Sequence, residues 1–441
     1  MGISEYEEYD VVGIGFGPSN LSLAIALEEY RASYPERPVT AAFFERQSAF
    51  GWHRNMLLPS ATMQVAFLKD LATFRNPTSR FTFVSYLHES GRLAQFTNNL
   101  DFFPTRQEFH RYLEWAESKL TDLVSYDSEV AAIRLPRGAG SGPADYLRVD
   151  IRSGGTRVRI VDARNVVIST GLVPRVPDDV ELDGRIWHSS EFLAKLRQMN
   201  TDDLTSVAVV GAGQSAAEVT RYLHDTIPHG QIYSIIPAYG YSVADATPFA
   251  NQVFDPAAVD DYYFGTDQTR HAFWNYHRNT NYSVVDDDLI RDLYRRLYDE
   301  DVRGARRLHF RNLTRVSTVK RAGSVVRLAL HSLLDGECQE LSVDAVVFAT
   351  GYDAMEPSGL LRDLDRYCLR DELGQLRVER DYRIVTTPEM PCGIYLQGGT
   401  EHTHGLSASL LSNIAVRSGE IADSIVRRRV EVSARMAESA G

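Results

Sequence analysis

The chain contains few cysteines, and none of them is spaced for redox or metal chemistry. The three, Cys338, Cys368 and Cys392, are far apart among 441 residues. They form no Cys-x-x-Cys pair and no metal-ligand spacing, so a dithiol reductase is disfavoured and we expect no metal centre. Such sparse cysteines are typical of a reduced, cytoplasmic protein.

Long hydrophobic runs and an excess of basic charge are also absent. No apolar stretch approaches the roughly twenty residues that a membrane-spanning helix needs, and the acidic residues 1–8 carry no signal-peptide pattern. The net charge of -12, from 47 basic and 59 acidic residues, argues against nucleic acid or an anionic membrane as the main partner. With 44% hydrophobic and 24% charged residues, the chain has an ordinary globular composition, and its length allows about two to four domains.

What the chain does contain is two glycine-rich turns of one kind. The first follows an apolar run at 9–12 and reads Gly13-Ile14-Gly15-Phe16-Gly17-Pro18. The second follows an apolar run at 207–210 and reads Gly211-Ala212-Gly213-Gln214-Ser215-Ala216. Each has a strand pattern before it and a helical pattern after it, which is the context of a dinucleotide-binding fingerprint. Proline and alanine replace the third glycine, and both are compatible with the start of a helix.

Two such turns predict two dinucleotides, and a usual reason to hold two is the transfer of hydride from a nicotinamide to a flavin. In the first unit, Glu45 follows a strand predicted over 39–44 and can accept both hydroxyls of an adenosine ribose. In the second unit, the strand predicted over 231–236 runs into Pro237-Ala238-Tyr239, with neither an arginine nor an acid. The missing acid argues mildly against NADH, and a basic residue from elsewhere could serve NADPH.

An internal repeat divides the chain. The strand endings Thr170-Gly171 and Thr350-Gly351 echo each other, which supports two related Rossmann-like units in an α/β fold. The first unit is predicted over 1–199 and again over 383–441, where the chain ends in an amphipathic helix. The second unit is predicted over 200–382, as an insertion into the first.

The segment from 50 to 70 mixes aromatic, polar and basic residues without a clear period. It fits a long packed loop whose tryptophan and histidine anchor the core. It also fits a segment that covers a flavin, with Lys69 as a cation for a substrate carboxylate. Asn251 and the run Asn279-Thr280-Asn281 are, as residues alone, most often turn asparagines. These alternatives stay open on the residues alone.

Taken together, these segments resemble the flavin-dependent side-chain amine N-hydroxylases, and specifically the L-ornithine N-monooxygenases of siderophore and related peptide pathways. The resemblance covers nearly the whole chain, from Asp10 to about Arg427. Its most specific phrases are Met63-Gln64-Val65-Ala66-Phe67-Leu68-Lys69-Asp70-Leu71, Pro248-Phe249-Ala250-Asn251, Asn279-Thr280-Asn281-Tyr282-Ser283-Val284 and Thr403-His404-Gly405-Leu406-Ser407.

The resemblance implies the roles of five residues at the substrate. Lys69 would pair with the substrate carboxylate, Asn251 would hold the amino-acid end, and Leu410 would line the site. Asn281 would lie between the terminal amine and the nicotinamide, and Gln64 near the reactive edge of the flavin, so these two are the expected catalytic residues.

The resemblance also implies the residues at the two nucleotides and a small, mainly helical substrate-binding region at about 245–300. Ser407 or Ser409 is expected to cap the C-terminal helix, whose N-terminus suits the electron-rich edge of a reduced flavin. The expected cofactor-binding residues are Gly13, Gly15, Gly17, Pro18, Glu45, Trp52, His53, Gln64, Val130, Gly211, Gly213, Gln214, Ser215, Ala216, Thr350, Gly351, Ser407 and Ser409.

The implied chemistry uses FAD, NADPH and O2 and passes through a 4a-hydroperoxyflavin that hydroxylates the side-chain amine of L-ornithine. NADH in place of NADPH, lysine or a diamine such as putrescine or cadaverine in place of ornithine, and an NAD(P)H:flavin-type reductase in place of the hydroxylase remain alternatives. A disulfide reductase lacks its cysteine pair here, and a Baeyer–Villiger monooxygenase lacks its FxGxxxH signature. A non-enzymatic flavin sensor would not need Lys69, Asn251 and Asn281. The resemblance further implies a homo-oligomer, a dimer or a tetramer.

Overall fold

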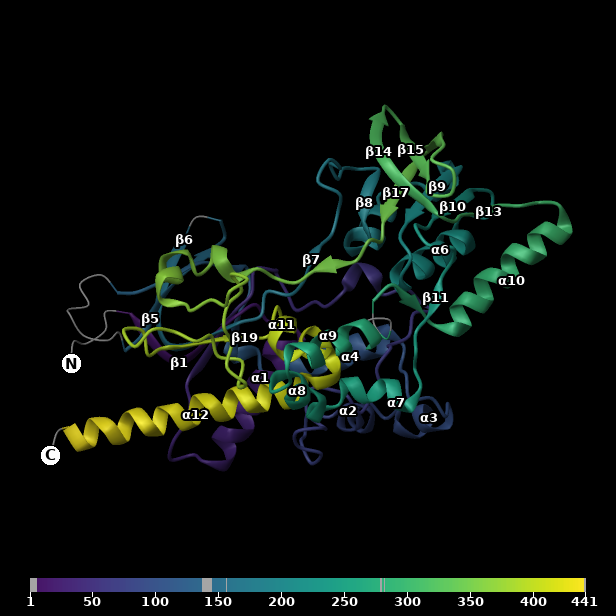
Figure 1. The fold of residues 1–441 in the computed structure, drawn as a ribbon. Coiled ribbons are helices and arrows are strands. Elements are labelled where there is room, and N and C mark those ends of the chain that lie inside the picture. Colours follow the sequence, from purple (N-terminus) through teal and green to yellow (C-terminus); the bar gives the residue numbers. More distant parts are fainter. Residues whose placement is uncertain (1–5, 137–144, 156, 278–279, 281, 440–441) are drawn as a thin grey trace.

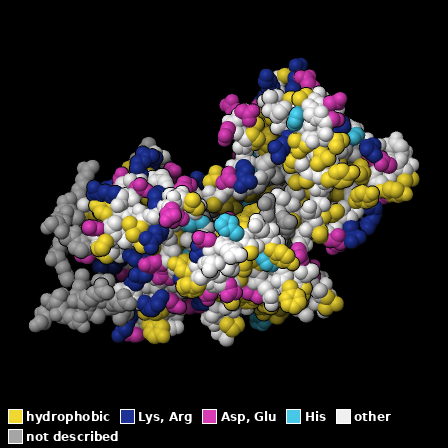
Figure 2. Space-filling model, in the orientation of Figure 1, with side chains coloured by type: hydrophobic (Ala, Val, Ile, Leu, Met, Phe, Trp, Pro, Cys, Tyr) yellow, Lys and Arg dark blue, Asp and Glu magenta, His cyan; other side chains and the backbone are white. Residues whose placement is uncertain are grey.

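The computed structural model describes residues 6–136, 145–155, 157–277, 280 and 282–439. It consists of two lobes, each built around its own β-sheet, with both chain ends at the first lobe (Figure 1). Figure 2 shows the same lobes with their side chains filled in, separated along one margin by a hollow.

The first lobe is built on a seven-stranded sheet. Its strands are β1 (Glu7–Ile14), β2 (Ala41–Phe44), β3 (Val124–Ser125), β4 (Ser128–Arg134), β5 (Leu147–Ser153), β6 (Arg157–Ile168) and β19 (Gly393–Leu396). The order is β3-β2-β1-β6-β5-β4, with β19 also paired to β6. Neighbours from β3 to β6 and β19 pair in parallel, whereas β4, β5 and β6 pair antiparallel.

Helices α1 (Pro18–Ser33) and α12 (Ile414–Ser439) lie side by side in the first lobe. Their buried residues join one core with those of α2 (Phe83–Glu89) and α4 (Arg106–Glu117). The opposite core of the sheet is completed by a segment that includes Met355, Leu364 and Ile384. No helix in the described part of the chain is both long enough and apolar enough to cross a membrane.

The second lobe is built on a parallel sheet of five strands. They are β8 (Ile186–His188), β9 (Ser206–Val210), β10 (Gln231–Ile235), β13 (Leu308–Arg311) and β17 (Ala345–Phe348). The order is β13-β10-β9-β17-β8. Helices α6 (Gln214–Thr226) and α10 (Asp287–Arg303) contribute to one core, and the antiparallel strands β14 (Thr314–Ala322), β15 (Val325–Ser332) and β16 (Cys338–Val343) contribute to the other. With β1-α1-β2 in the first lobe and β9-α6-β10 here, the predicted α/β fold with two Rossmann-like units is confirmed.

Two of the places where the chain passes between the lobes pair with each other. These are β7 (Val173–Pro174) and β18 (Tyr352–Asp353), an antiparallel pair, and β7 lies between the lobes in Figure 1. The second sheet therefore begins before residue 200, because β8 forms its edge. The chain also returns to the first lobe before residue 382, because the apolar residues that follow β18 pack against the first sheet.

The segment that follows β10 and the short strand β11 (Ser242–Val243) reaches back to the first lobe. It forms α7 (Pro248–Asn251), α8 (Pro256–Tyr263) and α9 (Asp267–His277), which lie over the lower lobe in Figure 1. Helix α8 packs on α11 (Glu401–His404), and Arg380 pairs with Asp260 at 2.5 Å. The chain returns through β12 (Val284–Val285) to α10, so α10 belongs to the second lobe and only the earlier helices of the predicted region 245–300 lie on the first.

Candidate active site

The first glycine turn leaves unfilled space at the N-terminus of α1. Gly15 has a φ of 81°, and a Cβ there would meet the carbonyl oxygen of Ser169 at 2.4 Å, so only glycine fits the turn. Gly17 is the N-cap of α1 and offers no side chain to its first N–H groups, with Pro18 at the first helical position. A Cβ on Gly17 would meet nothing within 4 Å. Free N–H groups facing open space at a helix N-terminus fit the pyrophosphate of a dinucleotide.

Glu45 lies beside this turn and is 6% exposed. Its carboxylate accepts hydrogen bonds from the backbone N–H of Phe16 at 2.7 Å and of Gln47 at 2.8 Å. Each carboxylate oxygen keeps a further lone pair. The contacts fix the acid at the strand end where the sequence predicted a ribose ligand.

The second glycine turn has the same construction. Gly211 has a φ of 149°, and a Cβ there would meet the carbonyl oxygen of Ala349 at 2.3 Å. Gly213 is the N-cap of α6 without a side-chain cap, and Gln214, Ser215 and Ala216 form the first turn of that helix. This turn also fits a nucleotide phosphate.

Gln64 from the first lobe meets the second glycine turn through Asp286. The Gln64 amide donates to one carboxylate oxygen of Asp286 at 3.1 Å, and the Gln214 amide donates to the other at 2.8 Å. Asp286 returns its own N–H to the Gln214 oxygen at 2.9 Å. Two residues that the sequence assigned to different cofactors are thereby linked by one carboxylate.

Trp52 and His53 lie near the crossing between the lobes. Their rings meet edge to face with centroids 4.8 Å apart, and the His53 ring also meets Tyr352 of β18 at 5.9 Å. His53 has a φ of 47°, a left-handed conformation that is strained for a residue with a Cβ and is enriched at functional sites. Trp52 packs against the core of the first lobe, so the anchoring role is supported for the tryptophan.

Lys69 is half-buried and forms no ion pair within the described residues. Burial lowers the pKa of its ammonium below the ordinary value, and the nearby carboxylate of Asp255 opposes that shift. Asp255 is the N-cap of α8 and comes four residues after Asn251. A half-buried cation without a fixed partner is suited to bind the carboxylate of a ligand.

Asn251 and Leu410 belong to the same neighbourhood. Asn251 is the last residue of α7, and among the described residues its amide donates only to the Thr247 carbonyl at the start of that helix, 3.3 Å away. The next turn buries Val253 and Phe254 against Leu406, with Leu410 packed at the edge of this small cluster. The structure therefore brings the regions of Lys69, Asn251 and Leu410 together from three separate parts of the chain.

Ser407 and Ser409 lie in a 3-10 turn over Leu406–Ser409, and neither caps α12, which begins only at Ile414. The predicted cap was wrong because a second 3-10 turn, Leu411–Asn413, separates these serines from the helix. Instead, Ser409 and Tyr282 each donate a hydroxyl to Glu401, both at 2.6 Å. The adjoining Asn281 lies outside the described residues, as does Asn279.

The other predicted cofactor residues lie within β4 and at the crossing. Val130 is buried in the core that includes Met355 and Leu364, beside a bulge in β4, so only its backbone can face a ligand. Thr350 donates its hydroxyl to the carbonyl of Arg175. Gly351 has a φ of 84°, and its carbonyl accepts from His188 Nε2 at 3.0 Å. These two residues hold the crossing between the lobes in place.

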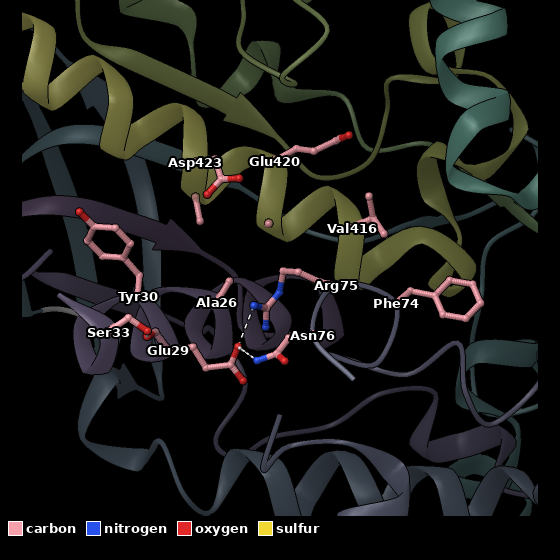
Figure 3. Close-up of a pocket in the computed structure, with 12 residues that line it drawn as sticks. Ala26, Glu29, Tyr30, Ser33, Phe74, Arg75, Asn76, Val416, Glu420 and Asp423 are labelled. Atoms are coloured by element: carbon pink, nitrogen blue, oxygen red, sulfur yellow. Dashed lines mark hydrogen bonds and ion pairs between the residues drawn. The ribbon is translucent and has the colours of Figure 1, made fainter. Parts of the chain in front are cut away.

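A separate groove lies between α1 and α12, away from these residues (Figure 3). It has a volume of about 390 Å³, and Arg75 pairs in it with Glu29 at 2.7 Å. None of the predicted site residues lines it. The groove is therefore not part of the candidate active site.

A family model described as L-lysine 6-monooxygenase/L-ornithine 5-monooxygenase matches residues 7–354. The chain belongs to this family. The L-ornithine N(5)-monooxygenase of Pseudomonas aeruginosa is 37% identical over 422 residues, which cover 95% of this chain and 93% of that protein. A solved structure of the Kutzneria sp. 744 ornithine N-hydroxylase, with reduced FAD, NADP+ and L-ornithine, has a TM-score of 0.92 at 60% identity and covers 96% of this chain and 100% of its own.

More distant members of the family keep the fold. The L-lysine 6-monooxygenase of Pseudomonas syringae has a TM-score of 0.82 at 30% identity, covering 95% of this chain and 99% of its own. Sequence reasoning missed Asp286, Glu218 and Glu401, which tie the predicted residues together. Asp286 lies two residues after the phrase that ends at Val284, but its acceptor role depends on side chains more than seventy residues away, as in its bond to Gln214.

Proposed function

We propose that this chain is a flavin-dependent L-ornithine N5-monooxygenase that uses FAD, NADPH and O2. In the balanced reaction, L-ornithine, NADPH, O2 and a proton give N5-hydroxy-L-ornithine, NADP+ and water. One oxygen atom enters the new N–O bond, and the other leaves as water with the two electrons of the hydride.

The observation that carries the proposal is the half-buried Lys69, without an ion pair in the described chain, beside the segment that bears Asn251. An α-amino acid offers such a cation a carboxylate, whereas a diamine does not. The 60% identity to a hydroxylase whose solved structure is named with L-ornithine supports the same substrate.

The two glycine turns supply the cofactor sites. FAD would lie on the turn of Gly13, Gly15 and Gly17 with Glu45 at its ribose, and NADPH on the turn of Gly211 and Gly213. Bound FAD, reduced by NADPH, supplies activated oxygen for transfer to the amine. On this proposal the first lobe is the FAD-binding domain, the second is the NADPH-binding domain, and α7 to α9 form the substrate-binding region between them.

The chain's own residues have to bind, orient and shield. Lys69 and Asn251 would hold the amino-acid end, so that the terminal amine is directed away from the ammonium of Lys69. Asn281 would hold that amine, and Gln64 would present its amide at the flavin edge. Ordering the substrate in this way removes much of the entropic cost of bringing amine and oxygen together.

We further propose a cytoplasmic homo-oligomer, a dimer or a tetramer, whose hydroxylamine product is a precursor for siderophore or related peptide synthesis. NADPH is the proposed donor, with NADH as the alternative.

The test is product formation from ornithine, lysine, putrescine and cadaverine by purified protein with FAD and NADPH. We expect hydroxylated ornithine to be the main product. If lysine or a diamine is hydroxylated more, that amine is the substrate instead of ornithine. NADPH oxidation without hydroxylated product from any of the four would refute the monooxygenase assignment.

A further inference from the structure

Asp286 lies at the start of α10, where an aspartate usually caps the helix. It is the N-cap of α10, with an extended backbone at φ -60° and ψ 137°. At such a position the carboxylate normally accepts a hydrogen bond from the second or third N–H of the helix. Here the side chain makes no capping bond. Helix capping therefore does not account for this carboxylate.

The carboxylate is turned instead toward two glutamine amides. Gln64 donates to Oδ1 at 3.1 Å, and Gln214 donates to Oδ2 at 2.8 Å. Gln64 belongs to the first lobe, whereas Gln214 is the first residue of α6 at the second glycine turn. Asp286 is thus the one side chain in the described contacts that joins both.

These contacts also fix which way each amide faces. Because both NH2 groups donate to the carboxylate of Asp286, neither amide oxygen faces that carboxylate. The Gln214 oxygen accepts the backbone N–H of Asp286 at 2.9 Å. The Gln64 oxygen has no partner within the described residues, so it is the atom left to accept a hydrogen bond from a ligand.

The contacts continue beyond Gln214 and return to the first lobe. Its amide also donates to Glu218 at 3.1 Å, and Glu218 is paired with Arg106 of the first lobe. The bridge therefore begins and ends in the first lobe and passes through the nucleotide turn of the second. It can form only when the two lobes are docked.

We propose that Asp286 is a positioning residue that couples the two nucleotide sites. It holds Gln214 at the phosphates of NADP(H) and, through the same carboxylate, sets the orientation in which Gln64 meets the flavin. This inference rests on the proposed function for the identity of the two nucleotides. Through the Asp286 carboxylate, binding of NADP(H) at Gln214 would change the orientation of Gln64 at the flavin.

The test compares purified holoenzyme with the variants Asp286→Asn and Asp286→Ser, with Asp287→Asn as the matched control on the next, exposed residue of the same helix. NADP+ is titrated into the oxidised protein, and its binding is followed by the absorbance change of the bound flavin. Loss of one charge-assisted contact should weaken NADP+ binding by about tenfold in both Asp286 variants. Serine caps helices well, so a residue needed only for α10 would be replaced by serine without loss.

A double-mutant cycle separates coupling from a general loss of fold. Gln64→Leu alone should also weaken NADP+ binding or reduce the flavin absorbance change, although Gln64 lies in the other lobe. Combined with Asp286→Asn, it should add little further loss. Additive effects, or NADP+ binding by both Asp286 variants within about twofold of wild type, would overturn the proposal. The NADP+ titration contains no amine, so its result does not depend on hydroxylation. If the Asp286 variants bind NADP+ more weakly but the wild-type protein hydroxylates no amine, the proposed function is refuted and the coupling role of Asp286 is not.

Discussion

Arg106 donates hydrogen bonds from both terminal guanidinium nitrogens to the carboxylate of Glu218, at 2.9 and 2.8 Å. Arg106 begins α4 in the first lobe, and Glu218 lies on α6 in the second, with its side chain 1% exposed. One of the Arg106 nitrogens also donates to the carbonyl of Met56 at 2.8 Å. A bidentate pair of this kind fixes the orientation as well as the distance of the two lobes.

Removing Arg106 should therefore destabilise the docked protein strongly. Arg106→Met leaves a buried carboxylate without its cation, at a cost of about 3 kcal/mol. Adding Glu218→Gln should recover part of that loss, since the uncompensated charge is gone. Urea unfolding of the single and double variants measures both effects, and an unchanged midpoint for Arg106→Met would show that the pair does not hold the lobes.

The two glycines of the first turn should behave differently on substitution. Gly17→Ala adds a Cβ to open space at an ordinary φ of -77°, so the protein should fold but lose flavin. Gly15→Ala places a Cβ against the Ser169 carbonyl at a positive φ, so folding itself should suffer. Circular dichroism and the flavin content of the purified variants distinguish the two. A fully flavin-loaded Gly17→Ala protein would place the cofactor elsewhere.

Lys69→Ala should raise the Michaelis constant for ornithine by about ten- to a hundredfold, the value of one charge-assisted contact. Reduction of the flavin by NADPH in the absence of amine should be little changed. Any turnover of putrescine should also be unaffected, because putrescine has no carboxylate. Steady-state kinetics with the exposed Lys320→Ala as control check this. An unchanged ornithine constant would remove Lys69 from the carboxylate role.

Acid should destabilise the protein through His404. This residue is 1% exposed, and burial lowers its pKa to about 3, whereas an unfolded histidine titrates near 6.5. The unfolded chain therefore binds a proton that the folded chain excludes between those values. Stability from this group is complete above about pH 6.5 and falls by about 1.4 kcal/mol per pH unit below it.

His404→Gln should flatten that dependence. Urea midpoints at pH 7.5 and 5 should differ less in this variant than in wild type, while the exposed His229→Gln should keep the wild-type slope. Equal slopes in all three proteins would contradict a buried neutral imidazole that excludes a proton.

The parts that sequence predicted are those with local signals. The glycine turns need positive φ values, 81° at Gly15 and 149° at Gly211. Glycine adopts such values readily, so the residue type itself predicts the turn. Glu45 was also predicted at its strand end, although its two backbone donors were not.

The parts that sequence missed depend on contacts between distant segments. The edge strand β8 has only three residues and is defined by pairing with β17. In the sequence, nothing about the apolar residues after β18 indicates which lobe they pack against. Asp286 resembles an ordinary helix cap until Gln64 and Gln214 are placed beside it.

We propose above all that this chain transfers one atom of O2 to the side-chain amine of ornithine. The most direct measurement supplies isotopically labelled O2 to the purified holoenzyme with NADPH and ornithine and analyses the amino acid by mass spectrometry. We expect N5-hydroxy-ornithine carrying one labelled oxygen, formed in a ratio to oxidised NADPH that approaches unity. NADPH oxidation that yields only hydrogen peroxide and unmodified ornithine would show that the chain is not an ornithine monooxygenase.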